Sequence, residues 1–164
     1  MRILGIDPGL AIMGYGVIDA NGSRISYVNH GCVYTTPDMT MTDRLEKLYK
    51  GTLELIDTFK PDVVSIEELF FAKNVKTAIS VAHARGVILL ACQQRQIIMH
   101  EFTPKQVKQS VVGYGHGDKK QVQYMVKVLL GLKDIPKPDD AADGLALAIT
   151  YSHVAHNSNS FRIK

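Results

Sequence analysis

RILGIDPGLAIMGYGVID, residues 2–19, is the stretch that decides the fold of this chain. Its first part, 2–7, is a short apolar run that ends in an acid and precedes Pro-Gly, the pattern of a strand followed by a turn. Its last part, 13–19, is rich in small and apolar residues, and an Asn-Gly turn signal separates it from a strand-like segment over 24–34. The chain is therefore predicted to begin with three antiparallel strands.

Beyond these strands the sequence alternates between helix and strand patterns. Residues 42–59 carry apolar side chains at helical spacing, whereas 62–68 is a short apolar run rich in β-branched residues. The remaining predicted segments are a strand over 97–102 and helices over 74–94, 104–112, 118–130 and 138–156. A block of hairpin strands followed by alternating helices and strands predicts an α/β fold, with a five-stranded mixed sheet flanked by helices.

Length and composition are those of an ordinary globular domain. The 164 residues are 46% hydrophobic and 21% charged, so we expect a single domain over residues 1–164, with 157–164 as a frayed tail. The longest apolar stretches are too short to span a bilayer, and the first strand follows Met1 directly. We therefore expect a cytoplasmic protein with no membrane partner.

Charge is distributed unevenly, although the net charge is only +3. Residues 1–69 contain 6 Lys and Arg against 10 Asp and Glu, whereas residues 70–137 contain 11 against 3. A basic middle segment flanked by acidic residues is suited to a polyanion that is held along its backbone and cut at one point. A basic surface that merely faces solvent gives the same pattern, so charge alone leaves both interpretations open.

Four acidic residues fall at the ends of predicted elements. Asp7 ends the first strand, Glu67 ends the strand over 62–68, and Asp140 and Asp143 lie three residues apart at the start of the last helix. The i, i+3 spacing places the two aspartates on nearly the same side of that helix. Glu68 points away from the face of Glu67, so only one of the two glutamates can enter a given site. Carboxylates that converge repel one another, and such a cluster usually holds divalent metal.

Each of these acids also has a purely structural explanation. Asp7 fits the first position of a type II turn, and a glutamate at a strand end can simply meet solvent. Asp140 can favour the helix N-terminus, although Asp139 already offers a cap. Three acids within five residues exceed what one cap requires. The combination of a strand-end Asp, a strand-end Glu and a helix with paired Asp residues therefore indicates metal-dependent phosphodiester chemistry.

Several short motifs carry a resemblance to a known family, in order and at matching spacing. They are Gly5-Ile-Asp-Pro-Gly9, Gly14-Tyr-Gly-Val17, Ile66-Glu67, Ala84-Arg-Gly86, Gln106-Val-Lys-Gln109, Lys119 to Gln123 and Asp140-Ala-Ala-Asp143. From residue 2 to about residue 155, the chain resembles the RuvC family of bacterial Holliday-junction resolvases.

The resemblance implies a ribonuclease H-like fold and a homodimer that resolves four-way DNA junctions in recombination and repair, by paired, symmetric hydrolysis of phosphodiester bonds. It implies that Asp7, Glu67, Asp140 and Asp143 are catalytic and bind Mg²⁺ or Mn²⁺, with two ions in each active site. The family's usual partners are the branch-migration proteins RuvA and RuvB. Gly144 departs from the family's more usual Ala, a change that costs about 1 kcal/mol inside a helix.

Candidate DNA contacts come from the basic middle of the chain. The resemblance places Lys108 and Lys119 near the cut strand and favours Phe70 as a wedge at the junction crossover. Charge and position along the chain add four further candidates, Lys73, Asn74, Lys76 and Lys120. For each lysine, an ordinary exposed side chain is the alternative.

Three other functions remain open from the sequence. A resolvase-like relative could act on RNA, and a catalytically silent module could bind junctions without cutting them. An ATP-binding half-domain of the actin and sugar-kinase type shares an opening strand and turn with Asp and Gly. Such ATPases generally need two related halves, and 164 residues provide room for one. Cleavage assays on DNA and RNA junctions, and a test for tight ATP binding, separate these classes.

Overall fold

The computed structural model describes residues 1–69, 75–154 and 162–163, with only the backbone described at 75 and 76. All of the strands and helices predicted from the sequence are present, with ends within two residues of those expected. The strands are β1 (Arg2–Asp7), β2 (Ile12–Asn21), β3 (Arg24–Tyr34), β4 (Val63–Glu67) and β5 (Ile98–Phe102). The helices are α1 (Met41–Phe59), α2 (Val75–Gln94), α3 (Pro104–Val112), α4 (Lys119–Leu129) and α5 (Asp139–Val154).

The strands form one mixed five-stranded sheet in the order β3-β2-β1-β4-β5. The first three strands are antiparallel, as predicted, whereas β4 is parallel to both β1 and β5. The parallel neighbours β1 and β4 are in register from the pair Ile3 and Val63 to the pair Ile6 and Ile66. Their carboxyl ends, with Asp7 and Glu67, therefore lie side by side at one edge of the sheet.

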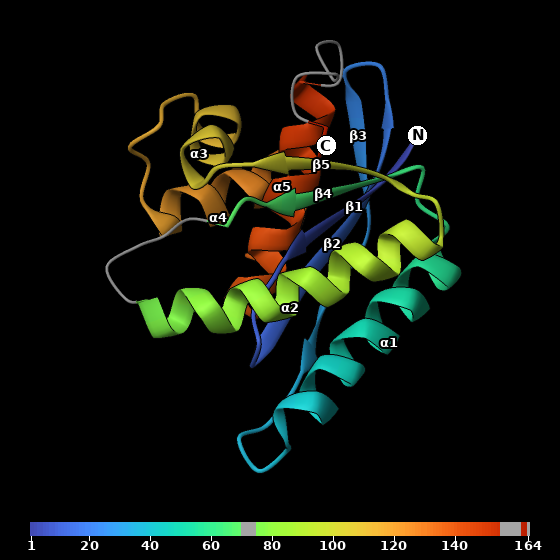
Figure 1. The fold of residues 1–164 in the computed structure, drawn as a ribbon. Coiled ribbons are helices and arrows are strands. Elements are labelled where there is room, and N and C mark those ends of the chain that lie inside the picture. The colour runs from blue at the N-terminus through green and yellow to red at the C-terminus, as the bar shows by residue number, and fades with distance from the viewer. Residues whose placement is uncertain (70–74, 155–161, 164) are drawn as a thin grey trace.

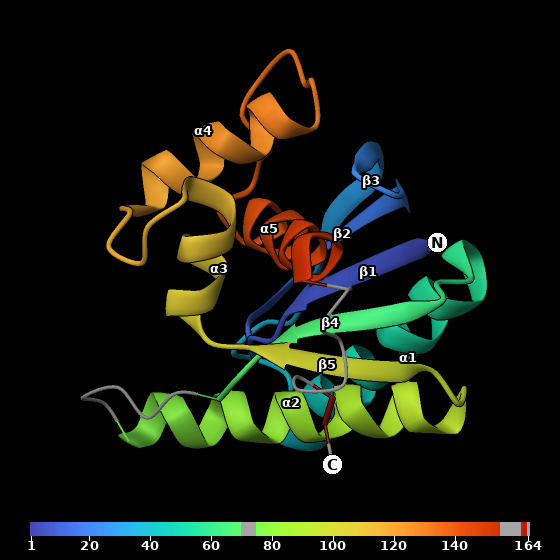
Figure 2. The same cartoon turned by 90° about the horizontal axis from the view of Figure 1, so that it is seen from above.

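Helices cover both faces of the sheet (Figures 1 and 2). The helices α3, α4 and α5 lie on one side, and α1 and α2 lie on the other. Each face has its own buried cluster of apolar side chains: Ile3, Val63 and Leu145 belong to the first, and Leu4 and Ile66 to the second. Because successive residues of a strand point to opposite faces, Asp7 and Glu67 share the side of Ile3 and Val63, which faces α5.

Helix starts are fixed by side chains that the sequence supplies locally. The Thr103 hydroxyl accepts a hydrogen bond from the backbone N–H of Gln106, whose side chain in turn accepts from the N–H of Thr103. Asp118 and Gln121 make the same reciprocal pair at the start of α4. Such capping boxes satisfy backbone donors that a helix leaves unpaired. They fix where α4 begins, and hence the position of Lys119.

The expected frayed tail over 157–164 lies largely outside the described residues. Within it, Arg162 forms an isolated antiparallel bridge with His100 of β5, and the Ile163 N–H donates to the Met99 carbonyl at 3.1 Å. Among the helices in the described part of the chain, none is long and apolar enough to cross a bilayer.

Candidate metal centre

The strand ends deliver two carboxylates to one place. Asp7 and Glu67 are half-buried and line a shared pocket of about 370 Å³. The expectation that only one of the two neighbouring glutamates enters the site is wrong, because the exposed Glu68 lines this pocket as well. Two positions before Glu67 on the same face, the buried Ser65 hydroxyl donates to the Leu147 carbonyl of α5 at 2.7 Å. This bond ties β4 to the helix that carries the other two acids.

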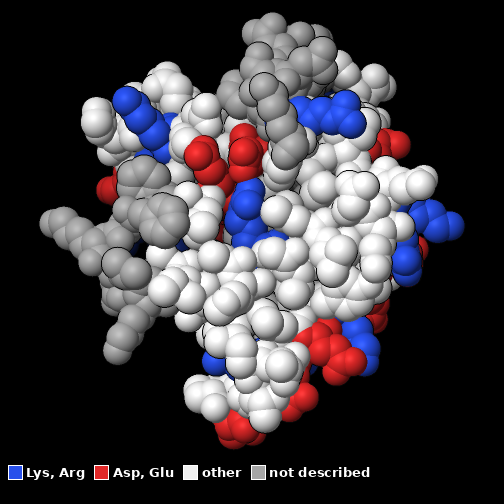
Figure 3. Space-filling view, viewed as in Figure 1, with Lys and Arg blue, Asp and Glu red and all other residues white. Residues whose placement is uncertain are grey.

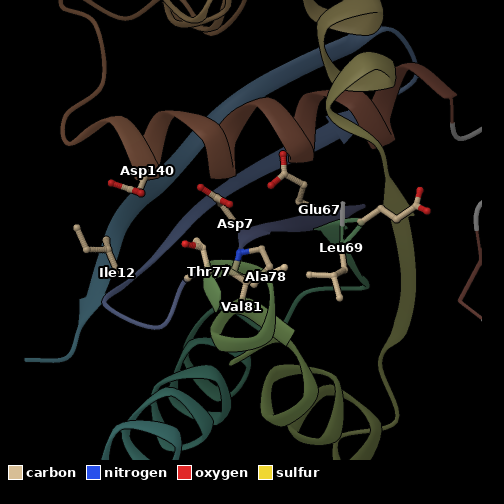
Figure 4. A pocket seen from close by; sticks show the side chains of 11 residues that line it. Asp7, Ile12, Glu67, Leu69, Thr77, Ala78, Val81 and Asp140 are labelled. Carbon is tan, nitrogen blue, oxygen red and sulfur yellow. The ribbon is translucent and has the colours of Figure 1, made fainter. Parts of the chain in front are cut away.

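Helix α5 brings Asp140 to this pocket and Asp143 to a second pocket that shares Glu67 with it. Asp140 lines the first pocket together with Asp7 and Glu67, and Asp143 follows one turn later. Figure 4 shows the carboxylates of Asp140, Asp7 and Glu67 in succession beneath the helix, with Asp7 in the middle. The four acids singled out in the sequence are therefore gathered from three elements, as their positions in the sequence predicted.

Backbone contacts without intervening side chains set the position of α5. A Cβ atom added at Gly14 of β2 would lie 1.9 Å from the Asp140 carbonyl oxygen, and one added at Gly144 would lie 2.6 Å from the Tyr15 carbonyl carbon. Both separations are far below van der Waals contact, so only glycine fits while the helix stays in place. Gly144 therefore has a packing reason in this chain, which offsets its helix-propensity cost of about 1 kcal/mol.

The carboxylates repel one another strongly. Burial, together with the negative charges of Glu67, Asp143 and Asp140, raises the pKa of Asp7 from 3.8 to about 8. Burial and the charge of Asp143 also raise the pKa of Glu67, although a hydrogen bond with the Asp7 carboxyl partly opposes this rise. The acids are thus close enough to change one another's ionisation, which is the electrostatic signature of a cation site.

One ammonium group sits at the edge of the acidic cluster. Lys119 Nζ lies 3.0 Å from Asp143 Oδ2. Burial raises the pKa of Asp143, and the hydrogen bond and charge of Lys119 act in the opposite direction. Burial alone would lower the pKa of Lys119, but its hydrogen bond to Asp143 and the nearby acids raise it overall. The acidic cluster therefore has one cation in direct contact with it, a lysine that the family resemblance placed near the cut strand.

The donor set suits a hard divalent cation. Its side chains offer only carboxylate oxygens, which Mg²⁺ and similar ions prefer. Within residues 1–69, 75–154 and 162–163, no three acidic, histidine or cysteine side chains are already closed to metal-binding distances. Like charges keep such a set apart until a cation draws it together. Burial is the largest cause of the raised pKa of Asp7, and the charges of the other three acids add to it.

Arg85 holds the strand end that carries Glu67, and sequence reasoning does not assign it a role. Its Nε donates to the Glu67 backbone carbonyl at 3.3 Å, and its Nη2 pairs with the Glu101 carboxylate at 2.5 Å. The Arg85 side chain is only 15% exposed, so this pair is well shielded from solvent. Helix α2 is thereby linked to both β4 and β5 beside the acids.

The predicted DNA-contact residues lie at different places relative to the acids. Lys108 and Lys119 line a second pocket that also contains Glu67 and Asp143, so both border the acids. Lys120 lies apart from them, in a hollow with Tyr124 of α4. The others lie outside what the structure describes: Phe70, Lys73 and Asn74 entirely, and Lys76 in its side chain.

Comparison with known proteins gives one consistent family. The model of the family described as Crossover junction endodeoxyribonuclease RuvC matches residues 3–151. A relative of that name from Thermosipho melanesiensis is 55% identical over 148 residues, which are 90% of this chain and 94% of its own. Another from Alkaliphilus oremlandii is 50% identical over 164 residues and covers both chains completely.

Solved structures agree with the sequence relatives. A structure described as T. thermophilus RuvC in complex with Holliday junction substrate superposes with a TM-score of 0.93 at 32% identity, and covers 99% of each chain. The yeast mitochondrial Holliday junction resolvase Ydc2 shares the fold, with a TM-score of 0.62 at 18% identity over 96% of this chain and 83% of its own. The ribonuclease H-like fold expected from the sequence is thereby confirmed. The chain belongs to the RuvC family of crossover junction endodeoxyribonucleases.

Proposed function

We propose that this chain resolves Holliday junctions in DNA recombination and repair, by cutting two opposed strands symmetrically. The observation that carries the proposal is the gathering of Asp7, Glu67, Asp140 and Asp143 around two pockets that share Glu67, in a chain that belongs to a nuclease family. A relative with the same fold over 99% of this chain is described as bound to a Holliday junction substrate.

Membership of this nuclease family implies a general dependence on divalent metal. We assign the four acids as ligands and catalytic residues for two ions of Mg²⁺ or Mn²⁺. When bound, the metal would supply a water of lowered pKa as nucleophile and stabilise the leaving 3′ oxygen. Asp7 lies between Asp140 and Glu67 in the pocket, so its carboxylate is the best placed to contact both ions.

Lys119 would change partners as substrate binds. Its ammonium now neutralises part of the Asp143 charge at 3.0 Å, and its side chain is 55% exposed. A phosphate that approached the acids would offer a second anion to the same ammonium. Lys108, which lines the same pocket, is the neighbouring cation for that phosphate. In the same proposal Phe70, Lys73, Asn74, Lys76 and Lys120 contact the arms of the junction.

We place the contact between two copies of the chain on helix α2. Ile79 and Leu90 are about half exposed on it, at 50% and 52%. Gly86 lies midway along the helix, where an added Cβ would meet no atom of the described residues within 4 Å. Figure 3 shows a largely uncharged surface over the region of α2, with charged side chains gathered lower in the view, over α1. A two-fold dimer presents one metal site to each of two opposed strands, which matches the symmetry of the junction.

The remaining parts of the proposal follow from the family. We propose a single nuclease domain over residues 1–164 in the cytoplasm, with the branch-migration proteins RuvA and RuvB as partners. A module without catalytic activity is disfavoured, because all four acids are present.

The decisive experiment is a nicking assay on a four-way DNA junction with Mg²⁺. The wild-type protein should cut opposed strands in pairs and should spare the matched linear duplex. Asp7→Asn should reduce the rate by at least about 100-fold while junction binding persists, because loss of a negative charge does not weaken phosphate attraction. Asp38→Asn, an acid in the turn before α1, is the matched control and should cut normally.

Four results would count against the proposal. Cutting by Asp7→Asn at the normal rate would remove the metal assignment. Preferential cutting of an RNA junction would change the substrate class, and tight ATP binding without cleavage would favour the half-domain alternative. A wild-type protein that remained monomeric at micromolar concentration would contradict paired incision.

A further inference from the structure

A second hollow adjoins the acidic pocket on the side away from Lys108 and Lys119. It has a volume of about 530 Å³ and is lined by the β1–β2 turn over residues 9–12, by Arg44 of α1 and by part of α2. The two hollows share Ile12, Thr77, Val81 and Asp140, all labelled in Figure 4. They are therefore continuous, so an extended ligand at the acids would run directly into the Arg44 groove.

Arg44 is held in this groove by a chain of hydrogen bonds. Its Nε donates to the Thr35 hydroxyl oxygen at 2.8 Å, and that hydroxyl donates to the Leu10 carbonyl at 2.5 Å. The Thr35 backbone N–H also donates to the Ala11 carbonyl at 2.9 Å. Thr35 is only 5% exposed. The buried threonine thus fixes the guanidinium against the turn that follows Asp7.

The charge of Arg44 is not neutralised within the protein as described. No carboxylate of residues 1–69, 75–154 or 162–163 forms an ion pair with it. Arg44 lines the groove, and the Thr35 hydroxyl accepts from its Nε, so the bond to Thr35 does not use the two terminal amino groups of the guanidinium. A planar guanidinium fork matches the two free oxygens of a phosphodiester.

We infer that Arg44 binds a backbone phosphate of the DNA strand that is cut, namely the strand whose scissile phosphate lies at the carboxylates. This inference rests on the proposed function. Asp140 and Arg44 line the same groove, so a strand crossing it passes from the metal site to a fixed cation. Lys108 and Lys119 stand on the other side of the acids. The strand is then held on both sides of the bond that is cut, which fixes its register in the active site.

The test is the salt dependence of junction binding, measured without Mg²⁺ so that no cleavage occurs. Removing one phosphate contact lowers the slope of log affinity against log salt by about one. Arg44→Gln should show this change and bind about 10-fold more weakly at 0.1 M salt. Arg24→Gln is the matched control, because it removes the same charge at an exposed position. Arg24 begins β3, whereas Thr35 follows the other end of that strand. The slope of Arg24→Gln should equal that of the wild type.

A single methylphosphonate, which neutralises one phosphate, locates the contact. The wild type should lose affinity when this group replaces the phosphate that meets Arg44, whereas Arg44→Gln should lose nothing further at that position. Thr35→Val keeps the charge but frees the guanidinium, so it should weaken binding by a smaller factor at an unchanged slope. If Arg44→Gln does not fold, the methylphosphonate is tested on Thr35→Val instead, which should lose less affinity at that position than the wild type.

An unchanged slope for Arg44→Gln, or additive losses from the variant and the methylphosphonate, would overturn the Arg44 assignment. These results are independent of the nuclease proposal, which is tested by whether the wild type cuts a junction. If the wild type cuts junctions but Arg44→Gln binds them like Arg24→Gln, the proposed function is kept and the phosphate site at Arg44 is rejected.

Discussion

The two faces of the sheet are packed in different ways. On the face of α5, helix backbone touches strand backbone: Gly14 meets Asp140, and Gly144 meets Tyr15. On the face of α1 and α2, ordinary apolar side chains such as Leu48 fill the space between helix and sheet. Backbone contact leaves no rotamer to absorb a displacement, whereas a layer of side chains can relax around a change. The face that carries the acids therefore tolerates displacement of its helix less than the other face does.

The largest expected difference between the two faces appears when glycine is replaced by alanine on each of them. Gly14→Ala should lower the cleavage rate by at least about 10-fold, because the methyl group displaces α5 and with it Asp140. The Mg²⁺ concentration for half-maximal rate should rise as well, since the ligands move apart. Junction cleavage at several Mg²⁺ concentrations measures both changes.

Gly51→Ala on α1 is the matched partner of Gly14→Ala. A Cβ atom there would lie 3.1 Å from the methyl groups of Val33, which are side-chain atoms with some freedom to move. The gain in helix propensity of about 1 kcal/mol offsets the small crowding, so stability and cleavage should stay close to those of the wild type. Equal losses of activity from both glycine variants would erase the distinction between the two faces.

A cavity on the α1 and α2 face should reduce stability without reducing chemistry. Leu48 is fully buried there, and Leu48→Ala should lower the free energy of unfolding by about 2 to 5 kcal/mol. Denaturant titration measures this loss. The cleavage rate at a temperature where the variant is folded should match that of the wild type. A rate that falls in proportion to stability would mean that both faces position the acids.

The smallest expected effect concerns the pH dependence of stability without metal. The folded-state pKa of Asp7 is raised to about 8, above its unfolded value, so its contribution to stability is full below about pH 4 and is lost as pH rises toward 8. The melting temperature in EDTA should therefore fall as the pH rises through this range. Asp7→Asn should remove most of this slope, and Mg²⁺ should reverse it in the wild type.

This pH experiment also has an outcome that contradicts the description of the site. A melting temperature that did not change with pH in EDTA, or that did not respond to Mg²⁺ at pH 8, would mean that the acids are too far apart to repel. The crowded acidic centre would then be absent from the α5 face.

Much of the fold and part of the site could be predicted from local patterns. Period-two alternation placed Asp7 on the face of Ile3, and the i, i+3 spacing placed Asp140 and Asp143 together. These patterns need no knowledge of distant contacts, because strand and helix geometry repeat along the chain. Element ends were accurate to two residues for the same reason.

The contacts that adjust the site could not be predicted in this way. Lys119 pairs with Asp143, and Arg85 holds the Glu67 carbonyl, but the partners are 24 and 18 positions apart in sequence. Arg44 lies in the acidic first part of the chain, outside the basic middle segment from which the DNA contacts were predicted. Only the distance between elements in the folded chain brings such partners together.

The sequence by itself determined the order and type of the elements, the four acids and the family, because each is written in residue identity and spacing. The tertiary structure alone decided how closely α5 approaches β2, which cation neutralises Asp143, and that Arg44 and Asp140 line one groove. These depend on packing between segments that are distant in the chain. A local pattern indicates which face of a strand or helix a side chain occupies. The packing of the elements against one another decides which residues it contacts there.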